Sequence, residues 1–122
     1  LVFARSYGSR VTKLGDFVVT DFQAAFPEAE QSDNDSRAVT ISGSKVLICR
    51  AAGELYAVEN RCTHQEAELE GGRIRGCFIS CPLHGVRFDL RDGTPMGQLT
   101  REALPIYEVR VLDGMIEVAL EN

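Results

Sequence analysis

Several kinds of segment are missing from this 122-residue chain. No apolar run approaches the roughly 20 residues that a membrane-spanning helix needs, so we expect no membrane segment. At the N-terminus, Leu1–Ala4 is followed at once by Arg5, and no long apolar stretch of the kind found in signal peptides comes next. We also find no internal repeat of about 20 residues or more. These absences predict one cytoplasmic domain that spans residues 1–122.

Basic residues are too few for a nucleic-acid-binding protein. The chain has 13 Lys and Arg against 18 Asp and Glu, which gives a net charge of −5. Because phosphate contacts need clustered basic side chains, nucleic acid is not an expected partner. The acidic balance is compatible with a protein partner that has a basic docking face.

Histidine is scarce, and its placement is informative. Both histidines of the chain lie beside a cysteine, in Cys62-Thr63-His64 and in Cys81-Pro82-Leu83-His84. Four cysteines could form disulfides in a protein of this size, but the spacing of Cys62 and Cys81 to histidine favours a metal site in a reducing compartment. Of the remaining two, Cys49 lies in an apolar segment and is expected to be buried, whereas Cys77 follows Gly76 at a predicted turn and could be exposed.

The rest of the pattern predicts an all-β fold with antiparallel strands. Short segments rich in Val, Ile, Leu and Tyr alternate with turn signals, of which Asp113-Gly114 is the strongest hairpin signal. A strand near 16–20 and a short helix over 21–26, with capping-box spacing at its start, are expected before an exposed acidic loop over 27–37. The other predicted strands are Ala38–Ser42, Lys45–Arg50, Glu54–Val58, Arg73–Arg75, Phe78–Ser80, Val86–Asp89, Ile106–Leu112 and Met115–Leu120.

Thiolate and imidazole ligands suit zinc or an iron–sulfur cluster. Zinc sites usually contain a Cys-x2-4-Cys or a His-x3-5-His pair, and this chain has neither. Each of the two motifs instead pairs one Cys with one His and can give one ligand to each of two irons, as in Rieske centres. Zinc remains the alternative at this stage.

Three stretches carry a resemblance to a known family: CTHQEAELEGG from Cys62, CPLHGVRFDLRDGTP from Cys81, and LPIYEVRVLDG from Leu104. They resemble the Rieske-type ferredoxins that serve bacterial aromatic-ring-hydroxylating dioxygenases, and the similarity runs from about Ala38 to the end. The resemblance implies a β-sandwich or barrel-like domain with a small cluster-binding subdomain, about 60–95, in which two loops hold one [2Fe-2S] cluster.

The resemblance also implies residue roles. Cys62 and Cys81 would bind the buried iron, and His64 and His84 would bind the outer iron near the surface. Pro95 and Met96 match a third loop that covers the cluster from the other side. Unlike respiratory Rieske proteins, this chain lacks the second Cys of each loop that forms a bridging disulfide, and it has Val86 and Phe88 where hydroxyl donors are expected. Fewer hydrogen bonds to the cluster predict a potential at the low end of the Rieske range.

By this resemblance the chain would be a one-electron carrier and not an enzyme. It would take electrons from a flavin-dependent ferredoxin reductase and pass them to a terminal oxygenase, through transient contacts and as a monomer. No nucleotide-binding glycine fingerprint follows a strand, so reductase activity is not expected here. Two alternatives stay open: a small Rieske subunit of another oxidoreductase, and a zinc-stabilised interaction or redox-sensing module. The glutamates at 66, 68 and 70 are either a solvated face or a docking patch.

Overall fold

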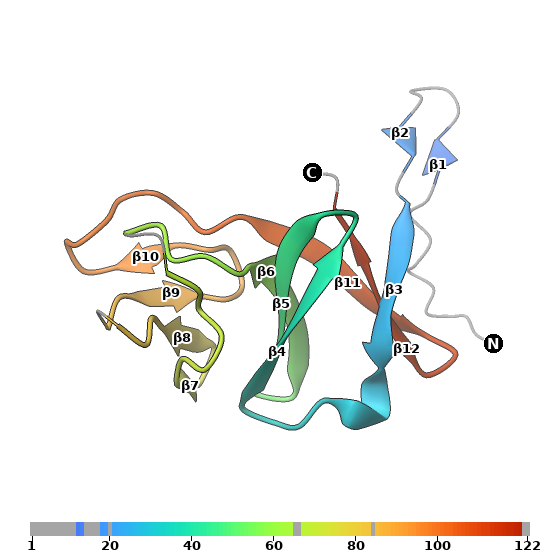
Figure 1. The fold of residues 1–122 in the computed structure, drawn as a ribbon, viewed down its shortest axis with the longest axis horizontal. Coiled ribbons are helices and arrows are strands. Elements are labelled where there is room, and N and C mark those ends of the chain that lie inside the picture. Colours follow the sequence, from blue (N-terminus) through green and yellow to red (C-terminus); the bar gives the residue numbers. More distant parts are fainter. Residues whose placement is uncertain (1–11, 14–17, 20, 65–66, 84, 121–122) are drawn as a thin grey trace.

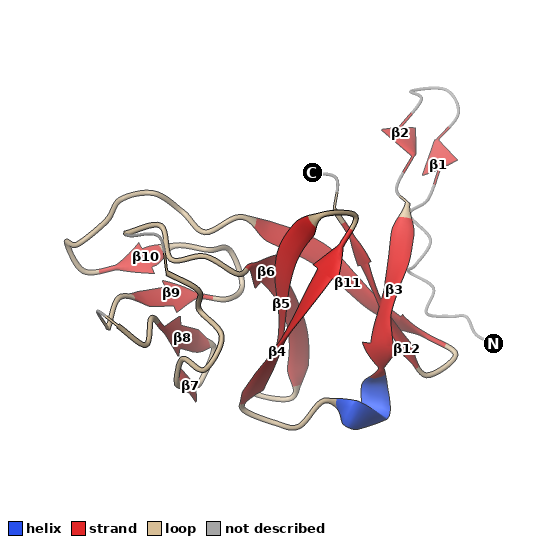
Figure 2. Ribbon diagram, in the orientation of Figure 1, coloured by secondary structure: helices blue, strands red, loops and turns tan. Residues whose placement is uncertain are grey.

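The computed structural model describes residues 12–13, 18–19, 21–64, 67–83 and 85–120. Among these, strands account for nearly all of the regular structure, and one short 3-10 helix is the exception (Figure 2). The expectation of an all-β, antiparallel fold is therefore confirmed. No helix within the described residues is long and apolar enough to cross a membrane. The elements are β1 (Thr12–Lys13), β2 (Val18–Val19), β3 (Phe22–Pro27), η2 (Glu28–Glu30), β4 (Asp35–Ile41), β5 (Ser44–Ala51), β6 (Glu54–Glu59), β7 (Ile74–Arg75), β8 (Phe78–Ser80), β9 (Arg87–Asp89), β10 (Pro95–Met96), β11 (Ile106–Leu112) and β12 (Met115–Ala119).

The larger sheet has six strands in the order β3-β12-β11-β6-β5-β4, and all of its pairs are antiparallel. The tight turns match the sequence signals. At Ser42-Gly43, Ala52-Gly53 and Asp113-Gly114, both turn residues have positive φ, as two-residue hairpins of type I′ require. The predicted meander over residues 38–58 and the hairpin over 106–120 are confirmed.

The segment 21–26 was expected to be a helix, and this prediction is wrong. Phe22–Pro27 is strand β3, which pairs with β12 through Ile116↔Phe26 and Ala119↔Phe22. The capping-box pattern predicted a helix of only six residues, and an isolated helix of that length has little stability. Strand pairing instead covers the open edge of β12 and buries Phe26. Of the strand expected near 16–20, Val18–Val19 is described as β2, and the other three residues lie outside the described part of the chain.

The segment 27–37 was expected to be an exposed loop, and this holds only in part. Its first residue ends β3, the 3-10 helix η2 follows, and its last three residues belong to β4. Gln31 is buried, and its Nε2 donates a hydrogen bond of 2.9 Å to the carbonyl oxygen of Asp35. The acidic composition correctly indicated exposed positions between these points, but it gave no sign of the buried amide.

A second, smaller sheet has four strands in the order β10-β9-β8-β7. It lies to one side of the larger sheet, next to the long segments that follow β6 and β10 (Figure 1). The strands predicted at 73–75, 78–80 and 86–89 correspond to β7, β8 and β9, whereas the pairing of Pro95–Met96 with β9 was not expected.

The two faces of β5 explain how the sheets are joined. Val46 and Ile48 on one face pack with the residues of β3 and β12, while Leu47, Cys49 and Ala51 on the other face pack toward the smaller sheet. This alternation is the period of two expected for a strand that is buried on both sides. The core on the second side contains Leu47, Cys49, Ala51, Val58, Cys62, Leu69, Ile74, Ile79, Cys81, Val86, Phe88, Leu90 and Leu104, and we call it the inter-sheet core.

Candidate functional site

Two of the predicted ligand residues lie in the inter-sheet core. Cys62 is fully buried, Cys81 is 2% exposed, and both are free thiols. Cys62 follows the end of β6 in the larger sheet, whereas Cys81 follows β8 in the smaller one. The fold therefore brings two cysteines that are nineteen positions apart in the sequence into one apolar environment between the sheets.

The two cysteines open loops that close in the same way. The Cys62 backbone N–H donates to the carbonyl oxygen of Ala67 at 2.7 Å, and the Cys81 N–H donates to that of Val86 at 2.8 Å. In both loops the acceptor is five residues after the cysteine. Gly85 takes a φ of 75° in the second loop, a conformation that glycine adopts without strain. The two cysteines are therefore followed by loops of equal span, each closed by one backbone hydrogen bond.

Of the two predicted histidine ligands, the structure describes only His64. His64 lies within the first loop, and its side chain is half-buried, with Nδ1 shielded from solvent. His84, the histidine expected from the second loop, lies outside the described residues, as do Gln65 and Glu66. Within the described part of the chain, no three Cys, His, Asp or Glu side chains form a group that could hold a metal ion.

A third segment, residues 97–105, is tied to the first loop. The Thr63 hydroxyl donates to the carbonyl oxygen of Glu102 at 2.8 Å. Since that uses its only hydrogen, Thr100 is the donor in the 3.2 Å contact between the two threonine hydroxyls. Thr100 Oγ1 in turn accepts from the Glu102 backbone N–H at 3.1 Å. The segment after β10 is therefore anchored to the first loop at Thr63. Pro95 and Met96, which the resemblance placed in a third loop over the cluster, form strand β10, and their covering role stays a prediction.

Asn60 anchors the other end of the first loop, a role that no sequence motif indicated. Its side chain is 3% exposed, and Oδ1 accepts hydrogen bonds from the backbone N–H groups of Leu69 at 2.9 Å and Glu70 at 3.0 Å. Its own N–H donates to the Lys45 carbonyl at 3.0 Å. The sequence does place an Asn two residues before the first cysteine. This could have indicated the role, because the side chain of a buried Asn usually forms hydrogen bonds with backbone groups.

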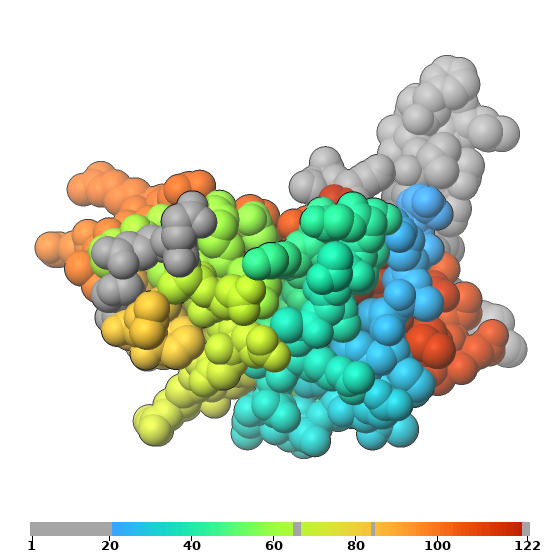
Figure 3. Space-filling view, viewed as in Figure 1, coloured from blue at the N-terminus to red at the C-terminus, as the bar shows by residue number. Residues whose placement is uncertain are grey.

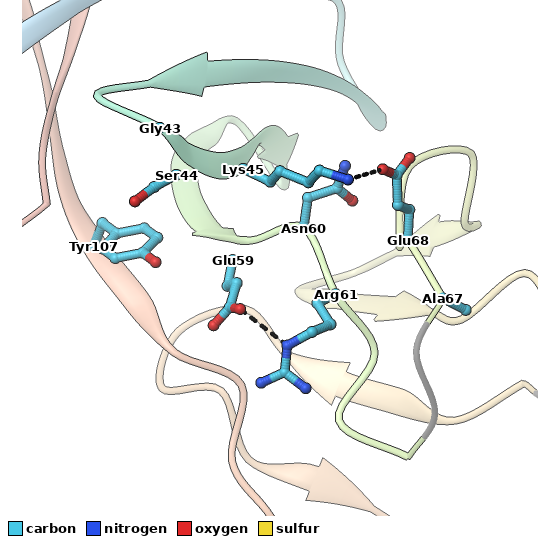
Figure 4. A pocket seen from close by; sticks show the side chains of 9 residues that line it. All are labelled: Gly43, Ser44, Lys45, Glu59, Asn60, Arg61, Ala67, Glu68 and Tyr107. Carbon is cyan, nitrogen blue, oxygen red and sulfur yellow. Dashed lines mark hydrogen bonds and ion pairs between the residues drawn. The ribbon is translucent and has the colours of Figure 1, made fainter.

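A polar pocket of about 410 Å³ lies where this loop meets the larger sheet (Figure 4). Lys45 pairs with Glu68 at 3.1 Å, and Arg61 pairs with Glu59 at 2.9 Å. The Tyr107 ring lines the pocket from β11, and burial raises the pKa of its hydroxyl, so it stays neutral. Because the charged side chains around the pocket form ion pairs with one another, we interpret the pocket as a contact region between the first loop and the larger sheet, and not as a ligand site.

The remaining two cysteines have other surroundings. Burial, aided by the charge of Asp35, raises the pKa of Cys49 to about 12, so its thiol stays protonated at neutral pH. This agrees with the expectation of a buried apolar residue. Cys77 is half-buried rather than exposed, and it lies beside Tyr56, whose pKa is raised by burial and by this thiol.

The donor set fits a sulfur and nitrogen metal centre. Two buried thiols and a shielded imidazole nitrogen are ligands that iron–sulfur clusters and zinc accept, whereas Mg²⁺ and Ca²⁺ prefer oxygen ligands. Comparison with known families decides between the two. Residues 21–108 match the family described as the Rieske [2Fe-2S] domain. The chain belongs to this family. Its cofactor is therefore a Rieske-type [2Fe-2S] cluster.

Individual Rieske proteins are similar to this chain over most of its length. It is 31% identical over 90 residues to the ferredoxin subunit of anthranilate 1,2-dioxygenase from Burkholderia cepacia, a match that covers 73% of this chain and 83% of the relative. It is 33% identical over 79 residues to the ferredoxin component of the naphthalene 1,2-dioxygenase system from Pseudomonas putida, covering 65% of this chain and 76% of the relative.

Solved Rieske structures share the fold. The ferredoxin of carbazole 1,9a-dioxygenase from Nocardioides aromaticivorans IC177 superposes with a TM-score of 0.78 at 29% identity, over 84% of this chain and all of the other. A chain from the complex of reduced oxygenase and oxidized ferredoxin in carbazole 1,9a-dioxygenase gives 0.77 at 29% identity, over 83% and 94%. The expected resemblance to Rieske-type ferredoxins is confirmed.

Proposed function

We propose that this protein is the ferredoxin component of an aromatic-ring dioxygenase system and carries one electron at a time through its [2Fe-2S] cluster. Its relatives are electron-transfer components, so the chain itself is a carrier and not the catalyst of a substrate reaction. In this proposal Cys62 and Cys81 hold one iron, and His64 and His84 hold the other. The observation that carries the assignment is the placement of two buried cysteines at the start of two loops closed by the same hydrogen bond.

The residues around the site suit such a carrier. When bound, the cluster accepts one electron and later gives it up. The thiols of Cys62 and Cys81 would lose their protons on binding it, since thiolates are the ligands. Their burial in the inter-sheet core keeps water from the sulfur atoms. In this proposal the iron held by His64 and His84 would be the one nearer the surface, where electrons enter and leave. We propose a cluster-binding subdomain at about 60–95, a range that includes both loops and strands β7, β8 and β9.

The partners follow from the relatives and from the surface near the loops. We infer transient contacts with a flavin-dependent ferredoxin reductase and with a terminal oxygenase, for a monomeric cytoplasmic protein that does not bind membranes or nucleic acid. Leu83 in the second loop is 70% exposed, Met96 at the end of β10 is 40% exposed, and Leu99 in the third segment is 56% exposed. Exposed apolar side chains around a redox site support docking of another protein there.

The decisive experiment is visible absorption and low-temperature EPR of anaerobically purified protein, before and after dithionite, with iron and acid-labile sulfide counted. Two irons, two sulfides and a rhombic EPR signal after reduction are expected. A colourless, EPR-silent protein that contains one zinc would contradict the proposal and support the zinc-stabilised module. A cluster-bearing protein that remains in a stable complex with a catalytic subunit would instead support a small subunit of another oxidoreductase.

A further inference from the structure

The outward side of the smaller sheet carries a concentration of positive charge. Ile74, Ile79 and Phe88 point into the inter-sheet core. The residues that alternate with them point outward and line a cavity of about 170 Å³. These are Arg73, Arg75, Phe78, Ser80 and Arg87, which we call the arginine face.

Among the described residues, no carboxylate neutralises the charge of this face. Several basic side chains elsewhere have acidic partners, as in Arg37–Glu30 at 2.6 Å and Arg110–Glu117 at 2.6 Å. Arg73, Arg75 and Arg87 are exposed, and none of them has a carboxylate oxygen within 4.0 Å among the residues that the structure describes.

Two side chains at this face, Asp89 and Phe78, already interact with arginines. Asp89, which pairs with Phe78 across β8 and β9, has both carboxylate oxygens bound by Arg91 at 2.9 Å. The Arg87 guanidinium lies over the Phe78 ring, 5.2 Å from its centroid. An arginine stacked on a ring is held in position while its N–H donors remain available.

The arginine face adjoins the second cluster loop. Ser80 immediately precedes Cys81, Arg87 immediately follows Val86, and the two residues are direct partners across β8 and β9. On the other side of β9, Arg87 is paired with Met96 of β10, which is one of the exposed apolar residues. Basic and apolar surfaces therefore meet at the base of the loop that leads to His84. In the space-filling view, the yellow and orange part of the chain to which they belong forms one end of the molecule (Figure 3).

We propose that the arginine face is a docking surface for an acidic patch on a redox partner protein, with a partner carboxylate seated between Arg73, Arg75 and Arg87. The inference rests on the proposed function and names the chemistry of one partner. It is the opposite of what the net charge of −5 suggested, namely a basic docking face. An acidic partner is repelled by most of this molecule and attracted at one place, so the same charges that speed the encounter also orient it.

The test uses the cluster-loaded protein and two fluorescein-labelled probes, decaglutamate and decalysine, at an ionic strength of about 10 mM, where charges act over roughly 30 Å. We expect decaglutamate to bind and salt to weaken the binding. Replacing two arginines, in Arg73→Gln/Arg75→Gln, is expected to weaken it about tenfold. Arg37→Gln/Lys45→Gln is the matched control, because it lowers the net charge equally, from −5 to −7, on the larger sheet, and it should change affinity less than about twofold.

Arg87 gives a second, independent comparison. Arg87→Gln is expected to weaken decaglutamate binding about threefold, whereas Arg87→Lys keeps the charge and should retain most of the affinity. The visible and EPR spectra of the cluster should be unchanged in every variant. Loss of the cluster would therefore concern the proposed function, and it can be told apart from loss of docking.

Three results would overturn the docking surface. The first is no decaglutamate binding, or binding of decalysine alone. The second is an equal effect of the two double variants, since affinity would then follow net charge and not location. The third is complete displacement of the peptide by about 1 mM inorganic phosphate, with tighter phosphate than peptide binding, which would make this cavity a site for small anions.

Discussion

At the scale of single residues, three buried cysteines share the inter-sheet core but differ in role. Cys49 lies within β5 and is surrounded by side chains of a continuous strand, whereas Cys62 and Cys81 each open a loop whose backbone turns around them. We therefore expect Cys62→Ala, Cys81→Ala, His64→Ala and His84→Ala each to abolish the native visible and EPR spectrum. Cys49→Ala is the control and should retain it. Loss of the spectrum in Cys49→Ala would contradict the ligand assignment.

The protonated thiol of Cys49 predicts an effect of alkaline pH on stability. Burial raises its pKa from 9.0 in the unfolded chain to about 12 in the folded one, so between these values the unfolded state loses a proton that the folded state keeps. The contribution is fully present below pH 9 and is lost as pH rises, by up to roughly 1.4 kcal/mol per unit. In urea unfolding at about pH 8 and about pH 10.5, wild type should lose more stability than Cys49→Ala. If the difference in unfolding free energy between wild type and Cys49→Ala were the same at both pH values, the raised pKa of Cys49 would be contradicted.

Asn60 gives a prediction about how the first loop is held. Asn60→Ala removes the acceptor of two backbone N–H groups, at Leu69 and Glu70, and should lower the free energy of unfolding by roughly 2 to 3 kcal/mol. Asn60→Asp keeps the acceptor and should cost clearly less. Urea unfolding and the half-life of the visible absorption would measure both. Gln23→Ala, which removes an exposed bond to Ser42, is the control and should change stability by about 0.5 kcal/mol at most. If Ala and Asp at position 60 behaved alike, the hydrogen bonds would not be the cause.

At the scale of elements, Gly93 joins the smaller sheet to the third segment. Its N–H donates to the Asp89 carbonyl at 2.7 Å, and its carbonyl accepts from the Leu104 N–H at 2.8 Å. A Cβ at this position would lie 2.0 Å from the Leu104 carbonyl oxygen, whereas one at Gly53, with nearly the same φ, would meet nothing within 4 Å.

Because the two glycines share a φ near +80°, a pair of alanine variants separates backbone strain from steric clash. Gly53→Ala should cost about 1 kcal/mol through strain alone. Gly93→Ala should cost at least about 2 kcal/mol more, since the Leu104 backbone must move, and it should speed cluster loss by loosening the covering segment. Urea unfolding and visible absorption against time give both values. Equal costs at the two positions would show that the chain accommodates the extra methyl group.

Local signals predicted the strands better than the segments whose conformation depends on distant partners. The hairpin at Asp113-Gly114 could be predicted because both positions need positive φ and their residue types accept it. Strand β3 could not, since its conformation comes from β12, about 90 residues away, and its own residues also satisfy a helix pattern. The β10 pairing was missed for the same reason, as two residues carry no periodicity.

The site was predictable where ligand chemistry limits the residue types. Few sets of side chains bind such a cluster, so Cys62, His64, Cys81 and His84 could be proposed from spacing and resemblance, and their assignment as ligands stays a prediction. The roles of Asn60 and Thr63 depend on which backbone groups the fold leaves without a partner, and spacing does not report this. The arginine face was hidden because its members alternate with core residues on three different strands, and their charge is outweighed in the total.

At the scale of the whole molecule, the proposed electron carrier combines an apolar interior around the site with a charged surface near it. The inter-sheet core excludes water from the site, while the surface near the loops combines exposed apolar side chains with the arginine face. The larger sheet contributes paired charges, such as Arg50 with Glu28, which add little to any directional field. A partner can therefore recognise one end of the molecule while the bulk of the chain stays acidic.

We expect the apolar surroundings of the site and the negative net charge to lower the reduction potential of the cluster. Val86 and Phe88 are buried in the inter-sheet core beside Cys81 and offer no hydroxyl donor to a cluster. Reduction adds an electron to a chain of net charge −5 in surroundings of low polarity, and both factors favour the oxidised state. We expect a midpoint potential nearer about −150 mV than about +300 mV, measured by spectroelectrochemical titration.

Introducing one hydroxyl tests that explanation. Val86→Ser should raise the potential by roughly 60 mV, which corresponds to about 1.4 kcal/mol for a one-electron couple, if the new donor reaches the cluster sulfur or a thiolate. Val86→Ala makes a matched space without a donor and should move the potential much less. A wild-type potential well above 0 mV, or equal shifts in the serine and alanine variants, would mean that something other than missing donors governs the potential. A low wild-type potential together with a larger shift in Val86→Ser than in Val86→Ala would show that the apolar side chains after the second loop keep the potential low.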